Sequence, residues 1–482
     1  MGHTAVVPPA TYAPGPPTAR APIRERLSWA IYDFANTIFS MNVATLYFSV
    51  WLISDLGAKN TPYAIANGIA SLLVVFSVPL FGAISDATRR RKPWVVWFTL
   101  ASVVACALIG VLGQTTLPLI GASLQGGSPA PAGWQPTAGA LAGVLTAFVI
   151  ANYTYQAAQP FYNAMLTDLV PPDERGRLSG FGTAVGYVGT FAGLLFVFPF
   201  FNGSLPFLGE LPSAVLRALR SVVPYTSHAG RVSVFVPTAL LFLLFSLPLF
   251  FFCHDHHPVR EKTRVAWREA FRGVAETLRD TRRYPGTLRF ILASFLYQDA
   301  IGTIVSFMGL YAVKAIGLTH GAEATFFLLL TPPAIAGSYA LGLLVDRVGP
   351  KRTLALVLAS WVALLIALAL VTTRSGFWVV GFLIGVIFGG APTAERPMLL
   401  SLVPEAEASR FFSLMLLSAR AAAVAGPLIW GLTVDTLGPR AGDDIAYRAA
   451  VLTVAVMFVL SLVLLRGVPD RRPGADTPTA AA

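Results

Sequence analysis

Charged residues are rare in the long apolar stretches of this 482-residue chain, and those that occur there could bind an ion or a polar solute. In the hydrocarbon core of a membrane a charged group costs at least about 2.5 to 3.5 kcal/mol, so it is retained where it faces a cavity or a partner. Desolvation also favours the neutral form of a lone carboxylate, which opens proton uptake or cation binding to it. These residues are Asp33, Asp299, Glu395, Arg396 and Arg420.

Two of the acids begin stripes of polar residues at helical spacing, and a third stripe contains only amides. Residues three, four and seven positions apart share one helix face. Lipid offers that face no hydrogen bonds, so we expect the stripes to face protein or water. They could bind a solute, or they could join neighbouring helices at about 0.6 kcal/mol per contact. The stripes are Asp33, Asn36, Thr37 and Ser40; Asp299, Thr303 and Ser306; and Asn152, Gln156, Gln159 and Asn163.

Membrane-spanning helices are the elements that must position these residues. The chain is 55% hydrophobic and only 12% charged, whereas soluble domains carry about 25% charged residues. A helix needs about 20 apolar residues to cross a membrane. The sequence therefore predicts an all-α membrane protein with twelve transmembrane helices in two pseudo-symmetric six-helix halves. The predicted spans are 28–52, 62–84, 93–113, 139–167, 178–201 and 232–252, then 288–313, 323–345, 352–373, 376–402, 410–434 and 446–465.

The charged intervals between the spans suggest how the chain is organised. In the central interval, Trp267, Phe271, Val274 and Leu278 recur at helical spacing while arginines take the other faces. This pattern predicts an amphipathic helix on the inner membrane surface. The predicted parts are a disordered cytoplasmic tail (1–25), the first half (26–253), a cytoplasmic linker (254–287), the second half (288–466) and another disordered cytoplasmic tail (467–482).

The distribution of basic residues predicts the orientation in the membrane. The net charge is +11, and an N-terminus inside the cell puts most of the 35 Lys and Arg on the cytoplasmic side. We therefore expect cytoplasmic termini in a bacterial plasma (inner) membrane, and no nucleic-acid partner. Cys106 and Cys253 indicate neither a disulfide framework nor a metal site. No Gly-x-x-x-x-Gly-Lys-[Ser/Thr] motif for binding ATP phosphates occurs, and no cofactor is expected.

The two halves repeat one another in order and in detail. Both contain glycine, three residues, aspartate and then a basic cluster after the second predicted helix. Asn163-Ala-Met-Leu in the first half matches Arg396-Pro-Met-Leu in the second, and Asp33 matches Asp299. The glycine–aspartate motif suits a charge latch that closes one side of the molecule. Its residues are Gly82, Asp86, Arg90 and Arg91 in the first copy, and Gly342, Asp346, Arg347, Gly349 and Lys351 in the second.

Over nearly its whole length the chain resembles the major facilitator superfamily, whose loop between the second and third helices carries this motif. The first copy departs from the pattern with Ala87 and Arg89. Within the superfamily, the run from Trp29 to Asn36 and the Tyr162-Asn163-Ala-Met-Leu run are similar to the branch of autophagy-related vacuolar amino-acid effluxers and their bacterial relatives. Ala300 and Glu395 depart from that branch's motifs.

The resemblance implies a major facilitator fold in which the first, fourth, seventh and tenth helices line a central cavity. The polar stripes fall on these helices. It also implies that the glycine–aspartate motifs close the cytoplasmic side. We expect Asp86 to face helix ends and arginines of neighbouring helices, Arg175 or Arg177 among them. The residues expected to line the substrate or ion cavity are Asp33, Asn36, Thr37, Asn152, Gln156, Gln159, Asn163, Asp299, Thr303, Glu395 and Arg396.

We expect a monomeric secondary transporter that exports a small polar solute, for example an amino acid, by alternating access. Asp33 or Asp299, or both, would take up a proton or a cation, unless pairing with Arg396 or Arg420 keeps them ionised. A cation-coupled sugar symporter is the alternative within transport. A receptor that no longer transports and an intramembrane enzyme are alternatives of other classes. No catalytic residue is assigned, because acids on equivalent helices of two repeats fit a symmetric cavity better.

Overall fold

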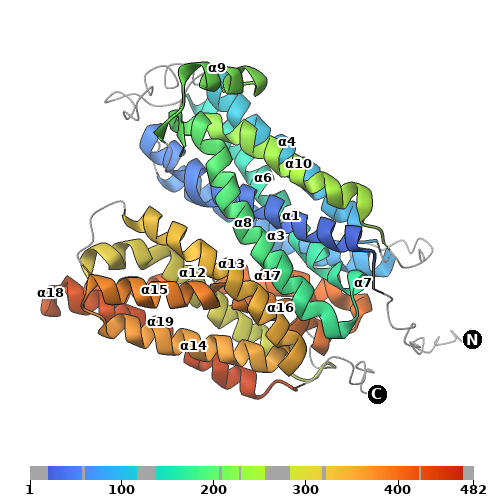
Figure 1. The fold of residues 1–482 in the computed structure, drawn as a ribbon, viewed down its shortest axis with the longest axis vertical. Coiled ribbons are helices and arrows are strands. Elements are labelled where there is room, and N and C mark those ends of the chain that lie inside the picture. The colour runs from blue at the N-terminus through green and yellow to red at the C-terminus, as the bar shows by residue number, and fades with distance from the viewer. Residues whose placement is uncertain are drawn as a thin grey trace, which may run out of the picture.

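The computed structural model describes residues 20–56, 60–88, 90–116, 137–205, 209–226, 230–255, 283–316, 322–422 and 425–470. The predicted linker helix and most of both predicted tails lie outside these ranges. The described chain is almost entirely helical and forms two groups of helices, one from each half of the sequence (Figure 1). The described residues begin, before α1, and end, after α19, at the same end of these groups, which we call the terminus side (Figure 1). The opposite end is called the far side.

The first group occupies the six spans predicted for the first half. Its first span starts three residues before the predicted start of that half and continues beyond α1 partly as π-helix. The elements are α1 (Ile23–Phe39), a π-helix (Ser40–Tyr47), α2 (Phe48–Val50), a second π-helix (Trp51–Asp55), α3 (Asn60–Thr88), α4 (Lys92–Thr116), α6 (Ala138–Ala164), α7 (Leu166–Leu169), a 3-10 turn (Pro172–Glu174), α8 (Arg175–Asn202) and α10 (Phe235–Phe252).

The second group follows the same order. One of its spans is built from two successive helices, α15 and α16. In another span, α17 and α18 lie on either side of residues 423–424, which are outside the described ranges. The elements are α12 (Thr287–Lys314), α13 (Ala322–Val348), α14 (Pro350–Leu370), α15 (Arg374–Phe388), α16 (Gly390–Leu402), a 3-10 turn (Glu405–Glu407), α17 (Ala408–Ala422), α18 (Ala425–Ala441) and α19 (Asp443–Arg466).

Smaller elements lie between α8 and α10. Two short antiparallel strands, β1 (Ser204–Leu205) and β2 (Gly209–Glu210), precede α9 (Ser213–Val222), and a 3-10 turn (Arg231–Val234) leads into α10. Helix α9 lies at the far side and leaves Val215, Leu219 and Val222 exposed (Figure 1).

Nine of the helices within the described residues are long and apolar enough to cross a membrane. The other three predicted spans, at α1, α13 and α17–α18, are also largely helical. The prediction of an all-α membrane protein with two six-helix halves is confirmed as a fold class, and the helices are consistent with twelve spans. One apolar core lies within the first half, and a second, larger core contains residues of both halves. Phe48 stacks on Phe148 at 3.9 Å between ring centroids in the first, and Trp361 stacks on Phe458 at 5.3 Å in the second.

The two halves touch most closely where α8 crosses α13 and where α3 crosses α17. A Cβ added at Gly180 would lie 2.6 Å from the carbonyl oxygen of Ser338 and 2.8 Å from the Cα of Gly342. A Cβ at Gly82 would lie 2.6 Å from the hydroxyl of Ser413. Small residues let helix backbones approach one another in membranes. Gly82 and Gly342, the first glycine of each motif copy, therefore allow these crossings between the halves.

Candidate functional site

An ion pair joins the two halves in the interior of the protein. Arg396 of α16 donates from one guanidinium nitrogen to Oδ2 of Asp33 at 3.0 Å and from the other to Oδ1 at 3.3 Å. The side chains are only 9% and 12% exposed for Asp33 and Arg396. A bidentate arginine–carboxylate pair fixes geometry as well as charge. The pair thus joins Asp33, near the start of the chain, to a residue of the second half.

The aromatic rings of Trp29 and Tyr162 both contact this guanidinium. Its central carbon lies 5.4 Å from the ring centroid of Trp29 and 5.6 Å from that of Tyr162, within the range of cation–π attraction. The two rings stack at 4.7 Å. The Trp29 indole N–H donates to the carbonyl of Tyr162, and the Tyr162 hydroxyl donates to the carbonyl of Trp29. Helices α1 and α6 therefore provide a rigid aromatic wall for Arg396.

The neighbouring acid, Glu395, has partners of a different kind. The hydroxyl of Ser294 donates to one carboxylate oxygen at 3.0 Å, and the side-chain amide of Gln298 donates to the other at 2.7 Å. Both partners belong to α12, so these bonds stay within the second half. Glu395 is buried, and its described hydrogen bonds come from neutral groups.

The predicted amide stripe of α6 divides into two parts. Gln156 donates to Asn152 at 3.0 Å, and Asn152 donates to Asn67 of α3 at the same distance, so this part connects helices. The side chain of Asn36 on α1 is buried without a hydrogen-bond partner for either polar atom among the described residues. One polar atom of Gln159 and one of Asn163 are also buried without a hydrogen-bond partner among the described residues. Such groups are costly unless water or a ligand satisfies them in some state of the protein.

Asp299 lies apart from the pair formed by Asp33. Its Oδ2 accepts the backbone N–H of Gly426 at 2.7 Å, at the start of α18. The hydroxyl of Thr303 donates to the backbone carbonyl of Asp299 at 2.8 Å. The side chain of Arg420, considered above as a partner, is not among those described. Thr37 likewise bonds a neighbouring helix, through the carbonyl of Gly186 on α8 at 2.5 Å.

At the terminus side, the aspartates of the two motif copies contact helix N-termini in the opposite half. Asp86 accepts the backbone N–H groups of Ser409 at 3.2 Å and Arg410 at 2.8 Å, at the start of α17. Asp346 accepts the backbone N–H of Arg177 at 2.9 Å, near the start of α8. Helix N-termini carry unsatisfied N–H groups and partial positive charge, so a carboxylate stabilises them. The two contacts are related by the pseudo-symmetry of the halves.

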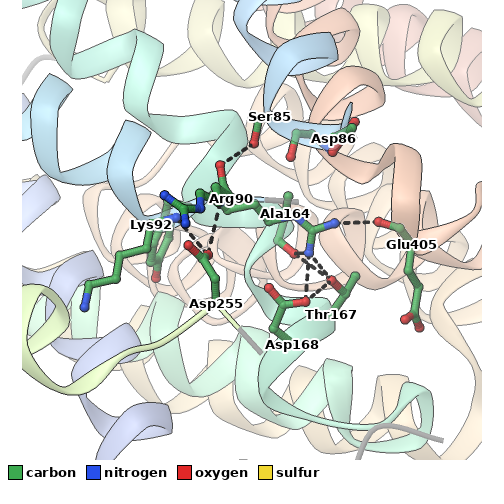
Figure 2. Close-up of polar contacts among 12 residues, drawn as sticks. Ser85, Asp86, Arg90, Lys92, Ala164, Thr167, Asp168, Asp255 and Glu405 are labelled. Carbon is green, nitrogen blue, oxygen red and sulfur yellow. Dashed lines mark hydrogen bonds and ion pairs between the residues drawn. The ribbon is translucent and has the colours of Figure 1, made fainter. Parts of the chain in front are cut away.

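Arg91 is a buried residue on the same side that bonds several segments of the chain, and Figure 2 labels its partners Ala164, Thr167, Asp168 and Glu405. Its guanidinium donates to the carbonyl of Ala164 at 2.9 Å and to Asp168 at 3.0 Å, and it also contacts the hydroxyl of Thr167. A further N–H reaches the carbonyl of Glu405 in the other half at 2.5 Å. Burial lowers the pKa of Arg91, but the surrounding carboxylates outweigh it and the net shift is upward. Arg91 therefore stays charged and joins three segments of the chain.

The expected partners of Asp86 bind elsewhere. Arg175 forms an ion pair with Glu405 across the halves, and Arg177 offers its backbone N–H to Asp346. The interpretation of Asp86 as facing a helix end agrees with the structure, but Arg175 and Arg177 are not the residues that bond it.

The remaining motif residues shape the ends of the helices. Arg90 is exposed and uses its carbonyl, which accepts the hydroxyl of Ser85 (Figure 2). Arg347 is also exposed. Lys351 donates to the carbonyls of Arg466 at 3.2 Å and Val468 at 2.5 Å, at the end of α19. Gly349 has a φ of +97°, a conformation that favours glycine, immediately before the first residue of α14. Arg89, which departs from glycine in the first copy, lies outside the described residues.

Sequence reasoning missed several partners. Ser294 and Gln298 stand four residues apart on α12, and this helical spacing could have marked them. Asp168, Glu405 and Asp255 lie just beyond predicted spans, where acids are ordinary. Asp255 accepts the N–H groups of Arg91 and Lys92 at the start of α4 (Figure 2). No pattern in the sequence pairs these acids with their partners.

Comparison with known proteins agrees with this architecture. Residues 59–476 match the family described as vacuole effluxer Atg22 like. The uncharacterized MFS-type transporter YxiO of Bacillus subtilis is 22% identical over 93% of this chain and 95% of its own length. The multidrug resistance protein MdtG of Proteus mirabilis is 25% identical over 82% of this chain and 85% of its own.

Solved structures show the same fold. The major facilitator superfamily transporter FucP, in the outward conformation, superposes with a TM-score of 0.66 at 15% identity, over 92% of this chain and 98% of its own. A bacterial homologue of the iron transporter ferroportin, in an outward-facing state, gives 0.62 at 14% identity over the same shares. The chain is a major facilitator superfamily transporter and belongs to the vacuole effluxer Atg22-like family.

Proposed function

We propose that this transporter is a secondary active carrier for a small zwitterionic solute, such as an amino acid, and exports it by alternating access. The observation that supports this most directly is the Asp33–Arg396 pair, which joins the halves in the protein interior. A zwitterion carries the same two charges as this pair. Its carboxylate could replace Asp33 at the guanidinium while its ammonium group takes the place of Arg396 at the aspartate. Binding of the solute would then exchange an ion pair between the halves for contacts to the solute.

The surroundings of the pair favour a small polar ligand. The aromatic wall of Trp29 and Tyr162 fixes the orientation of the guanidinium. A planar carboxylate that binds through both oxygens requires a guanidinium fixed in this way. Asn36, one helical turn after Asp33, has an unpartnered donor and an unpartnered acceptor to offer. Ligand pockets combine an apolar lining with a few polar groups that orient the ligand.

The contacts at the terminus side supply a gate for alternating access. Asp86, Asp346, Arg91 and Arg175 all contact the opposite half there, so this structure corresponds to a state closed on the terminus side. The positive-inside distribution of Lys and Arg supports a cytoplasmic terminus side. The bacterial relatives support a location in a bacterial plasma membrane.

A thermal-stability screen of the purified protein tests the substrate class. A ligand that binds only the folded protein at about 100 times its Kd stabilises it by about 2.7 kcal/mol. We expect one or more amino acids to raise the Tm of the wild type but not that of Arg396→Gln. The exposed Arg440→Gln serves as the matched control and should respond like the wild type.

The same amino acid should then exchange across proteoliposomes in a counterflow assay. Stabilisation and counterflow by sugars with no response to amino acids would contradict the proposal and favour a sugar symporter. An equal response of wild type and Arg396→Gln would show that the ion pair is not the binding site.

A further inference from the structure

The three acids in the interior differ in whether their partners can accept a proton from them. Asp33 faces the guanidinium of Arg396, and Asp299 faces a backbone N–H. The guanidinium occupies both oxygens of Asp33, so a proton there would displace one of its bonds. A proton on Asp299 would lie on Oδ1, which has no hydrogen-bond partner among the described residues. Glu395 instead faces the hydroxyl of Ser294 and the side-chain amide of Gln298. A hydroxyl and an amide can each either donate or accept after a rotation. Glu395 is the acid whose neighbours satisfy both protonation states.

The charges around Glu395 also favour a proton on this residue. Asp33, Glu395 and Arg396 are buried together, and two acids with one base would leave one net negative charge if both acids were ionised. An uncompensated charge is costly in the membrane interior. A proton on Glu395 makes the group neutral while the bidentate pair of Asp33 and Arg396 remains intact.

Other titratable groups near Glu395 are few among the described residues. Tyr297 of α12 and Arg396 of the same helix interact electrostatically with it, and Tyr187 of α8 and Tyr162 of α6 lie around Arg396. Helices α13, α14, α15 and α17 also pack against α16. The charged side chains described on them lie at the helix ends, and they are Asp346, Arg347, Lys351, Arg352, Arg374 and Arg410.

We propose that Glu395 is the proton-binding residue of the transport cycle and that its proton controls the ion pair between the halves. In the closed state Glu395 carries the proton and donates it to the Ser294 hydroxyl 3.0 Å away, which rotates to accept it, while Arg396 binds Asp33. When the pair opens, the O–H bond of Glu395 breaks and the proton passes to water. The carboxylate then balances the charge of Arg396, its neighbour in the sequence. The charge of Arg396 is thus balanced by a carboxylate whether or not the halves are joined, by Asp33 in the joined state and by Glu395 in the open state.

This inference names the coupling ion and residue of the transport cycle proposed above, and so rests on that function, but its test needs no solute. Infrared spectra of the purified protein in liposomes, recorded through a pH titration, should show a protonated-carboxyl band that is lost as pH rises. Glu395→Gln should lack the band. Asp299→Asn, the matched control, should keep it. Persistence of the band in Glu395→Gln, its loss in Asp299→Asn, or its absence from the wild type would each overturn the proposal.

A second pair of variants keeps the test open if Glu395→Gln fails to fold. Gln298→Leu removes an ambivalent partner and should change the pH at which the band is lost. Gln159→Leu removes an amide of α6 and should leave that pH unchanged. Equal behaviour of the two variants would count against Glu395.

The link to conformation can be measured with spin labels at Ser221→Cys and Arg440→Cys, which are exposed at the far side. The native cysteines are buried and should not be labelled. Rising pH should shift the distance between the labels towards shorter values in the wild-type background, because opening the terminus side brings the far ends together. The Glu395→Gln background should show no shift with pH. A pH-dependent shift that persists in Glu395→Gln would contradict the coupling. Because neither readout uses an amino acid, failure of the substrate proposal would leave both interpretable.

Discussion

Buried charges in this transporter are distinguished at the residue scale by the groups that face them. Asp33 has an arginine, Asp299 has the N-terminus of a helix, and Glu395 has a hydroxyl and an amide. The sequence treats the first two as equivalents, because they occupy matching positions of the two repeats. Their partners show that equivalent positions serve different purposes in the two halves. Arg396 occupies the position that matches Asn163. The first half therefore has no arginine at the matching position that could pair with Asp299.

Removal of the carboxylate from the central pair should be strongly destabilising. Asp33→Asn leaves Arg396 buried without its counter-ion, and breaking a buried pair from one side costs about 3 to 5 kcal/mol. We expect a large fall in Tm of the purified protein, and partial recovery in the double variant Asp33→Asn, Arg396→Gln.

The pair of Asp444 and Arg448 supplies the control for this experiment. Asp444 is 58% exposed, and its carboxylate lies 2.6 Å from Arg448. Exposed pairs are worth at most about 1 kcal/mol, so Asp444→Asn should change Tm little. Similar losses in Asp33→Asn and Asp444→Asn would show that the central pair is not structurally important.

Apolar length and repeat symmetry predict most of the elements of this fold. The predicted spans coincide with observed helices to within a few residues over most of the chain. Interruptions within spans are less visible, because a gap such as that between α15 and α16 changes neither length nor hydropathy. The partners of the site residues are not visible at all. Arg396 and Asp33 are 363 residues apart, and only the assembled halves bring them together.

The two aspartates of the repeated motif should contribute comparably to closure, although the first copy departs from the usual pattern. Each binds the N-terminus of a helix in the other half. A charge at such a position is worth about 0.3 to 1 kcal/mol, so Asp86→Asn and Asp346→Asn should each shift the equilibrium towards opening of the terminus side by about two- to fivefold.

Accessibility of a cysteine at the buried Ser179 of α8 reports this shift. Its labelling rate by a thiol reagent added to the terminus side should rise in both variants. An increase in only one of them would assign closure to a single copy, and unchanged rates in both would rule out the latch.

At the scale of the whole molecule, the two halves are related by pseudo-symmetry at the terminus side but not at the central ion pair. The terminus side is held by contacts that repeat about the pseudo-symmetry axis, and the central pair uses one residue from each half. The orientation of the transporter in the membrane is predicted from the distribution of Lys and Arg alone. The linker that connects the halves, predicted as an amphipathic helix, stays a prediction because it lies outside the described residues.

Labelling of single cysteines in intact cells tests the orientation. Ser221→Cys on α9 should react with a membrane-impermeant thiol reagent added outside. Asp470→Cys, exposed after α19, should react only once the cells are permeabilised. The reverse pattern would invert the molecule and assign the closed side to the exterior.

The separation of the central pair along the chain also has a consequence for biosynthesis. At about 5 to 20 residues per second, a ribosome needs roughly 20 to 70 s to progress from Asp33 to Arg396, 363 residues later. Throughout that delay the first half has a carboxylate without its counter-ion in a newly inserted helix. The insertion and quality-control machinery would recognise the unpaired acid and the amides around it. Chains truncated before α16 should therefore be degraded faster than the full-length protein, and replacing Asp33 should slow their loss.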